Sequence, residues 1–526
     1  MQRAFNRLYG QKFDLLICGG GIYGAWTAYD AALRGLTTAI VDKSDWAAGT
    51  SSASSKLIHG GLRYLETFDF KLVKKTLAER DMLLQAAPHR VWPLRFGIPS
   101  FKGSRLGKLQ LKAGLSLYDF LANTLPASQK HRQYSKADFI GHFPFLDPTL
   151  LTGGFSYFDA QTDDARLTLE LINGAYSAGA TCVNYCEVKN FIEENGRIVG
   201  AVLQDNVTNE ILEVSTRFAV DTAGRWSSLL SQKNDSCRLT KGIHLIMPGI
   251  LKDEALLLTA KSDGRVFFMI PWYNRTLLGT TDTNYDGDIE NVDISTKDIR
   301  YLLNEANYVL RTTQWTEQDI IGKFAGLRVL KQSHLSNPSN ISRDWSFQIA
   351  PNGLLSSIGG KITSAREDAA EIVDTVCGYL EVNQPCQTFG KPFPWIGDTD
   401  YRILQKESLH TAKALGIDDE SANWLLKRHG TRIQDIFKLC EENRQLITRI
   451  KPDLPLILAD IVFCSRNEMS VHLDDVLRRR LPLMILANLS ETDLSRLAGI
   501  VAENLGWDAE KTKMEIKNAC NNNSLD

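Results

Sequence analysis

The sequence predicts an α/β protein in three parts: a discontinuous domain with a parallel sheet, an inserted antiparallel β-sheet, and a C-terminal α-helical domain. Three observations predict this. Residues 13–42 have the pattern of a strand, a glycine-rich turn, a helix and a second strand. Residues 244–281 contain apolar runs around a Tyr-Asn turn, which is typical of antiparallel hairpins. After Asp398 the pattern is helical to the end of the chain.

The first element is a βαβ unit with a glycine-rich turn. Residues 14–18 form an apolar strand, and Gly19-Gly20-Gly21-Ile22-Tyr23-Gly24 follows at once. A helix rich in alanine continues to Leu33, and residues 38–41 form a second strand that ends at Asp42. The order of these parts is much more specific than the glycines alone. A glycine-rich turn in some other α/β domain is the alternative.

Each glycine of this turn has a physical role. Gly19 permits the tight turn, Gly21 lets a pyrophosphate approach the backbone, and Gly24 lets the helix pack closely on the strand. The helix N-terminus offers unpaired N–H groups to phosphate oxygens. Asp42 follows Gly24 by 18 residues, where a carboxylate accepts ribose hydroxyls. The unit therefore predicts a bound dinucleotide.

Composition excludes several classes of protein. The chain has 526 residues, 43% of them hydrophobic, and a formal net charge of −2, so we expect no nucleic-acid partner. No run of 18 apolar residues is present, and the polar, basic segment 1–12 does not resemble a secretory signal. The nine scattered cysteines predict neither a disulfide framework nor a metal site, and Cys182 and Cys186 are expected to be structural. These features favour the cytoplasm.

The later elements complete the expected organisation. A helix is predicted at 166–178, strands at 182–188, 217–221 and 354–358, and a further helix from about Ile362. Prolines between residues 385 and 394 mark a linker. The predicted domains are a first domain of residues 1–95, 155–240 and 340–382, a substrate-side domain of residues 96–154 and 241–339, and a helical domain of residues 398–526.

A serine-rich run begins eight residues after Asp42. Such a run is most often a flexible linker, but this one continues into a glycine pair and a helix-like stretch. Residues 50–66 read Thr-Ser-Ser-Ala-Ser-Ser-Lys-Leu-Ile-His-Gly-Gly-Leu-Arg-Tyr-Leu-Glu. This segment resembles the signature of the FAD-dependent glycerol-3-phosphate dehydrogenases nearly throughout.

Further segments extend the resemblance along almost the whole chain. They are Lys241–His244, Ile270–Trp272, Gly279–Asp282, Gly326–Arg328, Ile341–Asp344, Gly359–Thr363 and Asp475–Arg480. The resemblance implies an FAD-binding Rossmann-like domain of the glutathione-reductase/amino-acid-oxidase type. It also implies oxidation of sn-glycerol 3-phosphate to dihydroxyacetone phosphate, hydride transfer to FAD, and electron transfer to a membrane quinone. The cofactor-binding residues expected from the turn and the resemblance are Gly19, Gly21, Gly24, Asp42, Thr50, Ser51, Ser52, Ser55, Lys56, His59, Gly60, Gly61, Val188, Gly224, Gly360, Lys361 and Thr363.

Cationic side chains in these segments suit a phosphorylated substrate. A phosphate monoester favours a planar, bidentate donor, which arginine supplies better than lysine. Arg63, Arg328 and Arg343 are the candidates, with Lys361 as a point charge beside the flavin. Each arginine alone is more often a solvated surface residue.

Two further side chains have expected roles in the site. His244 could accept the proton of the substrate hydroxyl, because imidazole titrates near neutrality. A histidine satisfied within the sheet is the alternative. Tyr64 could position the substrate or pack on the flavin ring. The helix expected from Ile362 would present its N-terminus to the reduced flavin and stabilise its negative charge.

The chain departs from the family pattern at Tyr23, Asp221, Arg225, Val329 and Ala365. None of these removes an assigned arginine, but they leave three alternatives open. One is a paralogue that oxidises another phosphorylated polyol. The second is an oxidase that uses oxygen, or an amine-oxidising enzyme of the same superfamily. The third is a flavin-binding regulator without turnover.

The segment 102–120 raises the question of membrane contact. Leu106, Leu109, Ala113, Leu117 and Phe120 recur at helical spacing, which fits a helix lying in a lipid interface. A helix packed on the substrate-side domain would show the same stripe. We expect attachment to the inner face of the cytoplasmic membrane and consider a homodimer possible. The run 478–480 of three arginines is expected to be a solvated helix face.

Overall fold

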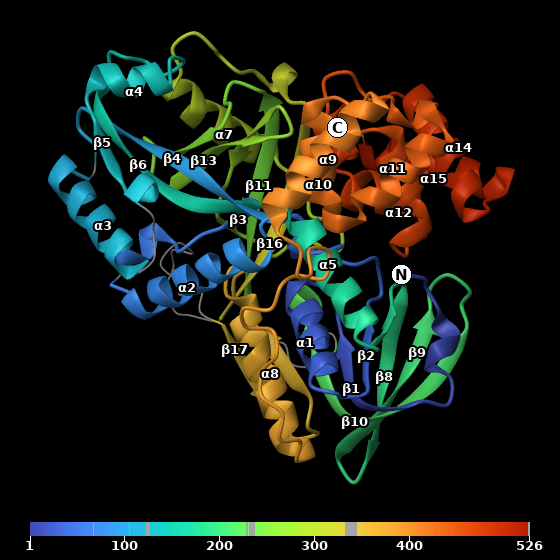
Figure 1. The fold of residues 1–526 in the computed structure, drawn as a ribbon. Helices are drawn as coiled ribbons and strands as arrows, with labels where there is room; N and C mark the ends of the chain where they lie inside the picture. Colours follow the sequence, from blue (N-terminus) through green and yellow to red (C-terminus); the bar gives the residue numbers. More distant parts are fainter. Residues whose placement is uncertain are drawn as a thin grey trace.

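The structure, a computed structural model, describes residues 1–66, 68–104, 106–122, 127–227, 230, 237–331 and 345–523. Two large sheets lie side by side, and a group of helices packs beside one sheet and above the other (Figure 1). The sequence runs from the first sheet into the second twice before it enters the C-terminal helices. The segment around Arg343 lies outside the described residues.

The first sheet has eight strands in the order β17-β18-β10-β1-β2-β7, with β9 paired to β10 and β8 to β9. The pairs among β18, β10, β1, β2 and β7 are parallel. Its strands are β1 Lys12–Cys18, β2 Thr38–Val41, β7 Thr181–Val183, β8 Cys186–Glu194, β9 Arg197–Asp205, β10 Ile211–Asp221, β17 Ser346–Ile349 and β18 Leu355–Ile358. The apolar residues of β1 are fully buried because helices and a hairpin cover its two faces.

Three helices cover one face of this sheet: α1 Ile22–Leu33, α5 Asp164–Ser177 and α8 Ala365–Leu380. Alanines at positions 25, 28 and 31 of α1 are completely buried, which lets α1 approach α5 and α8 closely. Figure 1 shows α1 in front of β1 with α8 beside it. The small side chains that suggested a cofactor helix therefore also form its packing surface.

The second sheet has ten strands in the order β15-β11-β14-β13-β12-β4-β6-β3, with β16 paired to β11 and β5 to β6. All described pairs in it are antiparallel except β4 with β12. Its strands are β3 Leu57–Ile58, β4 Val91–Phe101, β5 Arg132–Tyr134, β6 Leu151–Thr162, β11 Cys237–Pro248, β12 Glu254–Thr259, β13 Val266–Trp272, β14 Arg275–Gly279, β15 Thr283–Asn284 and β16 Gly322–Lys331. Tyr273 and Asn274 both have positive φ, which gives the β13–β14 hairpin its tight turn.

The predicted domain limits cut through strands of the second sheet. The limit at 95/96 falls inside β4, the one at 154/155 inside β6, and the one at 240/241 inside β11. Each of these strands belongs entirely to the ten-stranded sheet. The hydrophobic pattern alone did not reveal where the chain passes from one sheet to the other, because both sheets contain buried apolar strands.

Two local predictions differ from the structure. The strand predicted at 182–188 is broken into β7 and β8 at Tyr185, which has a positive φ. The helix predicted from Ile362 begins at Ala365, since Gly359 and Gly360 both adopt positive φ and a turn follows them. Four more helices flank the second sheet: α2 Phe70–Ala86, α3 Lys108–Leu121, α4 Lys136–His142 and α7 Thr296–Val309.

The C-terminal helices form the third part of the fold. They are α9 Tyr401–Leu415, α10 Asp419–His429, α11 Ile433–Glu442, α12 Leu458–Asn467, α13 Leu483–Leu486, α14 Glu491–Leu505 and α15 Ala509–Asn523. Among the helices of the described ranges, none is both long and apolar enough to cross a membrane.

The prediction that residues 478–480 form a solvated face is wrong for two of the three arginines. Arg480 is buried and pairs with Asp45, and Arg479 Nε donates to the same carboxylate at 2.6 Å. The partner lies 434 residues earlier, in the loop after β2. A basic run therefore joins the C-terminal helices to the first domain.

Candidate functional site

A cavity of about 550 Å³ lies between the two sheets, at the carboxyl ends of β1, β2 and β10. In an open parallel sheet this edge is where ligands bind. The first sheet contributes the glycine-rich turn and Asp42, and the second contributes residues of β11, β13 and β16. The volume is typical of cavities that bind cofactors and small substrates.

The glycine-rich turn is sterically closed to larger side chains. Gly19 has a φ of +114°, and a Cβ there would stand 2.7 Å from the carbonyl oxygen of Thr222. A Cβ on Gly24 would stand 1.9 Å from the carbonyl oxygen of Gly19. Gly21 is the N-cap of α1 and lines the cavity together with Ile22 and Tyr23, so the N-terminus of α1 lies at the cavity. The turn therefore offers backbone donors at the place where a pyrophosphate would lie.

Asp42 lies at the end of β2 and lines the cavity. Its carboxylate accepts hydrogen bonds from the backbone N–H of Gly20 at 2.6 Å and of Ser44 at 2.8 Å. Burial nevertheless raises the pKa of Asp42 to about 6. The side chain is therefore fixed by the turn itself, in the position that suits an acceptor for ribose hydroxyls.

The serine-rich segment, residues 50–55, forms another part of the cavity wall. Ser51 Oγ accepts a hydrogen bond from Ile22 N at 2.9 Å, and Thr50 Oγ1 donates to the carbonyl oxygen of Leu327 at 2.6 Å. Lys56 turns away from the cavity, and its Nζ lies 2.6 Å from the buried carboxylate of Asp164. The segment is thus anchored to α1, to β16 and to α5.

His244 lies in the middle of β11 and is buried. Its Nε2 lies 2.9 Å from Ser55 Oγ, and its ring stacks on Phe324 with the centroids 4.8 Å apart. Burial, together with the charges of Arg328 and Lys56, holds the pKa of His244 well below its usual value. The imidazole is therefore neutral at pH 7 and can accept a proton.

Arg328 lies on β16 opposite Thr240 of β11 and lines the same cavity as His244. Its guanidinium donates to the carbonyl oxygen of Thr281 at 3.1 Å, to Asp282 Oδ1 at 3.2 Å and to Thr280 Oγ1 at 3.0 Å. These contacts fix the plane of the guanidinium group. A fixed, planar donor is the arrangement that binds a phosphate in two places.

Lys361 and Tyr64 lie together on the wall of the cavity. Lys361 Nζ stands 3.6 Å from the centre of the Tyr64 ring. The hydroxyl of Tyr23 accepts from Lys361 N at 3.0 Å and donates to Asp368 Oδ2 at 2.7 Å. Tyr23 thereby ties the glycine-rich turn to the segment before α8.

The cavity brings together most of the predicted site residues. Those that line it are Gly19, Gly21, Asp42, Thr50, Ser51, Ser55, His59, Tyr64, Val188, Gly224, His244, Arg328, Gly360 and Lys361. The other predicted residues of the described ranges are not among its lining residues: Gly24, Ser52, Lys56, Gly60, Gly61, Arg63 and Thr363. Thr363 Oγ1 accepts from His59 N at 3.1 Å, so it supports a lining residue from behind.

Three residues were missed by the sequence analysis. Asp164 anchors Ser54 and Lys56, Asp282 orients Arg328, and Phe324 stacks on His244. Segment 279–282 resembles the family, and this resemblance could have pointed to Asp282. Asp164 and Phe324 carried no local signal, because their partners lie on other elements.

Comparison with known proteins agrees with this geometry. Residues 14–366 match the family described as FAD dependent oxidoreductase, and residues 389–512 match the C-terminal domain of alpha-glycerophosphate oxidase. A glycerol-3-phosphate dehydrogenase of Synechocystis is 37% identical, with 98% of this chain and 97% of that protein covered. An aerobic glycerol-3-phosphate dehydrogenase of Staphylococcus aureus is 33% identical, with 90% and 87% covered.

Solved structures show the same architecture. The FAD complex of a glycerol-3-phosphate dehydrogenase from Bacillus halodurans has a TM-score of 0.81 at 28% identity, with 98% of this chain and 96% of that chain covered. An L-alpha-glycerophosphate oxidase from Mycoplasma pneumoniae has a TM-score of 0.57 at 20% identity and covers 73% of this chain. The second likeness concerns the fold alone.

The fold and the cavity define an FAD-dependent oxidoreductase. The glycines at which a Cβ would collide, the cap of α1 and Asp42 form a cradle that fits FAD. The chain belongs to the FAD-dependent glycerol-3-phosphate dehydrogenase family. The predicted fold class, family and cofactor are confirmed by these matches.

Proposed function

We propose that this protein oxidises sn-glycerol 3-phosphate to dihydroxyacetone phosphate. The observation that carries the proposal is that one cavity is lined by two cations, Arg328 and Lys361, and by the neutral imidazole of His244. The cations suit a phosphate dianion, and they would repel a cationic amine. The names of the relatives support the same substrate.

Each side chain has a defined task in this reaction. Arg328 binds the phosphate, with its plane set by Thr280 and Asp282. Lys361 adds a second positive charge, and Tyr64 limits where its ammonium group can stand. His244 takes the proton of the C2 hydroxyl at Nε2, the nitrogen that faces Ser55. The bound FAD supplies the hydride acceptor.

The assigned cofactor residues follow from their positions. The glycine-rich turn and the N-terminus of α1 hold the pyrophosphate, and Asp42 accepts the ribose hydroxyls. The lining residues of the serine-rich segment contact the flavin side. We assign the eight-stranded sheet to cofactor binding and the ten-stranded sheet to substrate binding, and both contribute to the cavity.

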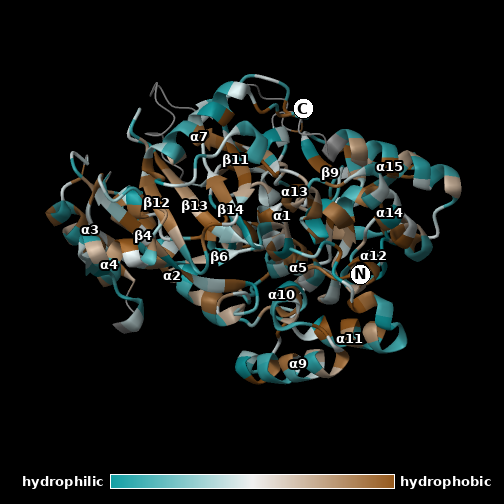
Figure 2. Cartoon of the chain, turned by 90° about the horizontal axis from the view of Figure 1, so that it is seen from above, coloured by the Kyte–Doolittle hydropathy of each residue, from teal (hydrophilic) through white to brown (hydrophobic). Residues whose placement is uncertain are grey.

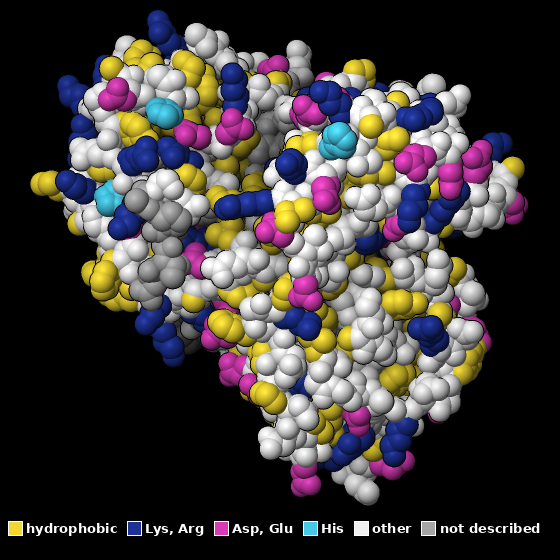
Figure 3. Space-filling view, viewed as in Figure 1, with side chains coloured by type: hydrophobic (Ala, Val, Ile, Leu, Met, Phe, Trp, Pro, Cys, Tyr) yellow, Lys and Arg dark blue, Asp and Glu magenta, His cyan; other side chains and the backbone are white. Residues whose placement is uncertain are grey.

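A membrane quinone is the proposed electron acceptor, and α3 is the proposed membrane contact. Leu109 is 84% exposed and Phe120 76% exposed, whereas Leu115 and Tyr118 of the same helix are buried in the core. Leu109, Ala113 and Phe120 of the apolar stripe therefore point outward, whereas Leu106 and Leu117 are half-buried. Helix α3 lies at the edge of the molecule (Figure 2), and Figure 3 shows hydrophobic and basic side chains side by side at this edge.

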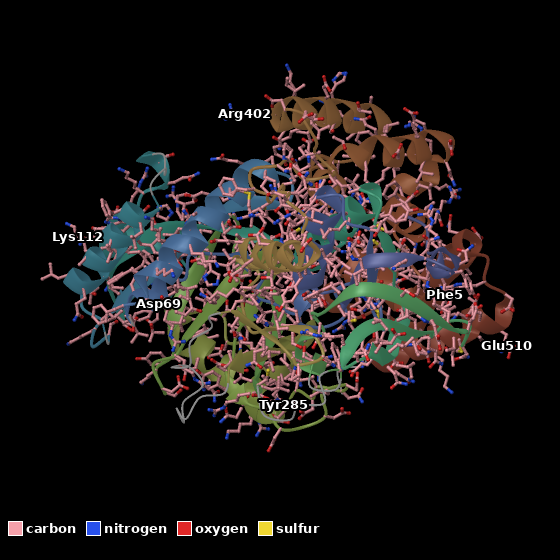
Figure 4. The ribbon with its side chains drawn as sticks, turned by 90° about the horizontal axis from the view of Figure 1, so that it is seen from below. Phe5, Asp69, Lys112, Tyr285, Arg402 and Glu510 are labelled. Carbon is pink, nitrogen blue, oxygen red and sulfur yellow. The ribbon has the colours of Figure 1, made fainter. Side chains whose placement is uncertain are left out.

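The neighbouring turn extends the same surface. Phe68 is 76% exposed, and its ring lies 6.0 Å from that of Phe70 at the start of α2. Lys112 on α3 and Asp69 lie toward the same end of the molecule (Figure 4). Exposed aromatic and leucine side chains beside lysines are the composition of a helix that lies in an anionic lipid interface.

The proposed reaction is tested by anaerobic titration of the flavin-loaded protein with sn-glycerol 3-phosphate. Bleaching of the oxidised flavin absorbance at stoichiometric substrate is the expected result. Flavin that dithionite reduces but sn-glycerol 3-phosphate does not would overturn the proposed substrate.

A further inference from the structure

A second cavity, of about 510 Å³, lies on the other side of the loop that follows Asp42. Its walls are residues 48–53 of that loop, the start of β16, and residues 484–488 of the C-terminal domain. It shares four lining residues with the cofactor cavity, and these are Ala48, Gly49, Ala53 and Arg225. One loop therefore separates the two cavities.

The second cavity is lined by three cationic and two acidic side chains. Arg225, Lys323 and Arg478 line it together with the two carboxylates of Glu290 and Asp293. Both carboxylates lie close to other cations. Glu290 Oε1 lies 2.6 Å from Lys43 Nζ, and Asp293 Oδ1 lies 3.7 Å from Lys241 Nζ.

Arg225 has an unsatisfied buried donor. Its guanidinium lies 4.1 Å over the ring of Trp226, and its Nε is buried without a hydrogen-bond partner among the described residues. Burial lowers the pKa of Arg225. A buried guanidinium N–H with no acceptor is rare in folded proteins, and a bound acceptor would satisfy it.

Arg478 differs from the two arginines that follow it. Arg479 and Arg480 both pair with Asp45. Arg478 is half-buried, lines the cavity, and forms no hydrogen bond or ion pair with any residue that the structure describes. The C-terminal domain therefore places a cation in the cavity that its own structure does not use.

We propose that this second cavity binds the phosphate group of a small metabolite, held by Arg225 and Arg478. Guanidinium groups are the donors best suited to phosphate oxygens. The bound group would connect the C-terminal domain to residues 48–53, which also wall the cofactor cavity. A phosphate bound in the second cavity would therefore contact the loop that walls the cofactor cavity, without contacting Arg328 or His244.

The test is a calorimetric titration of the flavin-loaded protein with inorganic phosphate, in parallel for the native chain, R328Q and R478Q. The native protein is expected to bind two phosphates. R478Q is expected to keep only the site at Arg328, and R328Q only the second site, each lost site weakened by about tenfold or more. A single phosphate in the native chain that R478Q leaves unchanged would overturn the proposal.

Further variants separate the possible failures. R225Q tests the other arginine of the pair and is expected to reproduce the loss in R478Q. Arg402→Gln on exposed α9 is the matched control, since it removes one positive charge far from the cavity. If R328Q keeps every phosphate while R478Q loses one, the second site stands and the role of Arg328 in the proposed function fails.

Discussion

The imidazole Nε2 of His244 lies 2.9 Å from the hydroxyl oxygen of Ser55, across 189 residues of sequence. This contact joins the serine-rich segment of the first domain to the middle of β11 in the second sheet. Both residues line the cavity. Because the ring is buried beside cations, it stays neutral until the solution is well below pH 6.5.

The first prediction concerns the pH dependence of turnover. If neutral His244 is the base, kcat/KM should stay flat as pH falls from 8 through about 6.5 and decline only well below that value. H244N should lower kcat by about 10²–10⁴-fold and abolish this acid limb. Steady-state rates from pH 5 to 8 measure both effects. An acid limb unchanged in H244N would assign the proton transfer to another group.

The second prediction concerns phosphate binding by Arg328. R328K keeps the charge but loses the bidentate geometry, so KM for sn-glycerol 3-phosphate should rise by about tenfold to a hundredfold. The matched control is R238K, since Arg238 lies on the neighbouring strand β11 and does not line the cavity. An unchanged KM in R328K would remove Arg328 from the substrate site.

The third prediction concerns Tyr23, one of the departures from the family pattern. Y23F removes the hydroxyl that bridges Asp368 and the backbone of Lys361. The folded state should lose about 1–3 kcal/mol because a buried carboxylate loses a donor, and kcat should fall as Lys361 becomes less fixed. Thermal unfolding and steady-state kinetics measure the two effects.

Y29F is the control, because Tyr29 is buried on the same helix and its hydroxyl makes no hydrogen bond to a described residue. Equal effects of the two variants would contradict the bridging role.

The fourth prediction concerns Asp221, another of the departures from the family pattern. Oδ1 accepts from Ala223 N and Ser227 Oγ, while burial raises the pKa of this carboxyl to about 6. Since the folded pKa lies above the unfolded value, ionised Asp221 destabilises the fold above pH 6, and the cost fades as pH falls toward 4.

D221N should therefore raise the free energy of unfolding at pH 8 by about 1–3 kcal/mol. Its advantage should shrink at pH 5, where the native carboxyl is largely protonated. Denaturant unfolding at the two pH values measures this difference. A constant advantage at both values would attribute the effect to packing rather than ionisation.

The fifth prediction concerns membrane contact through α3. Replacing both Leu109 and Phe120 by glutamate removes the exposed apolar side chains and adds negative charge. Flotation with vesicles of anionic phospholipid should then fall to background, because apolar insertion and attraction to the lipid charge are both lost. Ile403 is 55% exposed on α9, so I403E is the matched control and should float like the native protein. Failure of the native protein to float would refute the proposal.

The sequence analysis succeeded where the signal is local. The βαβ unit at residues 12–41 was predicted because its strands, glycines and helix follow one another directly. The same is true of the Tyr273-Asn274 turn, whose neighbours are two short apolar strands. The cavity residues were found largely through the resemblance of residues 50–66 and of the later segments to a family, not through periodicity.

Relationships between distant residues were not predictable from pattern. The spacing in α3 predicted a helix with an apolar stripe, but not that Leu115 and Tyr118 would be buried while Leu109 and Phe120 of the stripe face solvent. The pairing of Arg480 with Asp45 spans 435 residues, and a basic run on a helix is ordinarily solvated. The contact between Tyr23 and Asp368 spans 345 residues and depends on how α1 meets α8.

The pairing of Asp45 with Arg479 and Arg480 makes the two ends of the chain dependent on each other. Asp45 is completely buried, and loss of its cationic partners would leave an uncompensated charge inside the fold. A shortened chain that ends at the proline linker would therefore not be an independent cofactor-binding module. During synthesis, the loop that contains Asp45 cannot reach its final form until residues 479 and 480 have emerged.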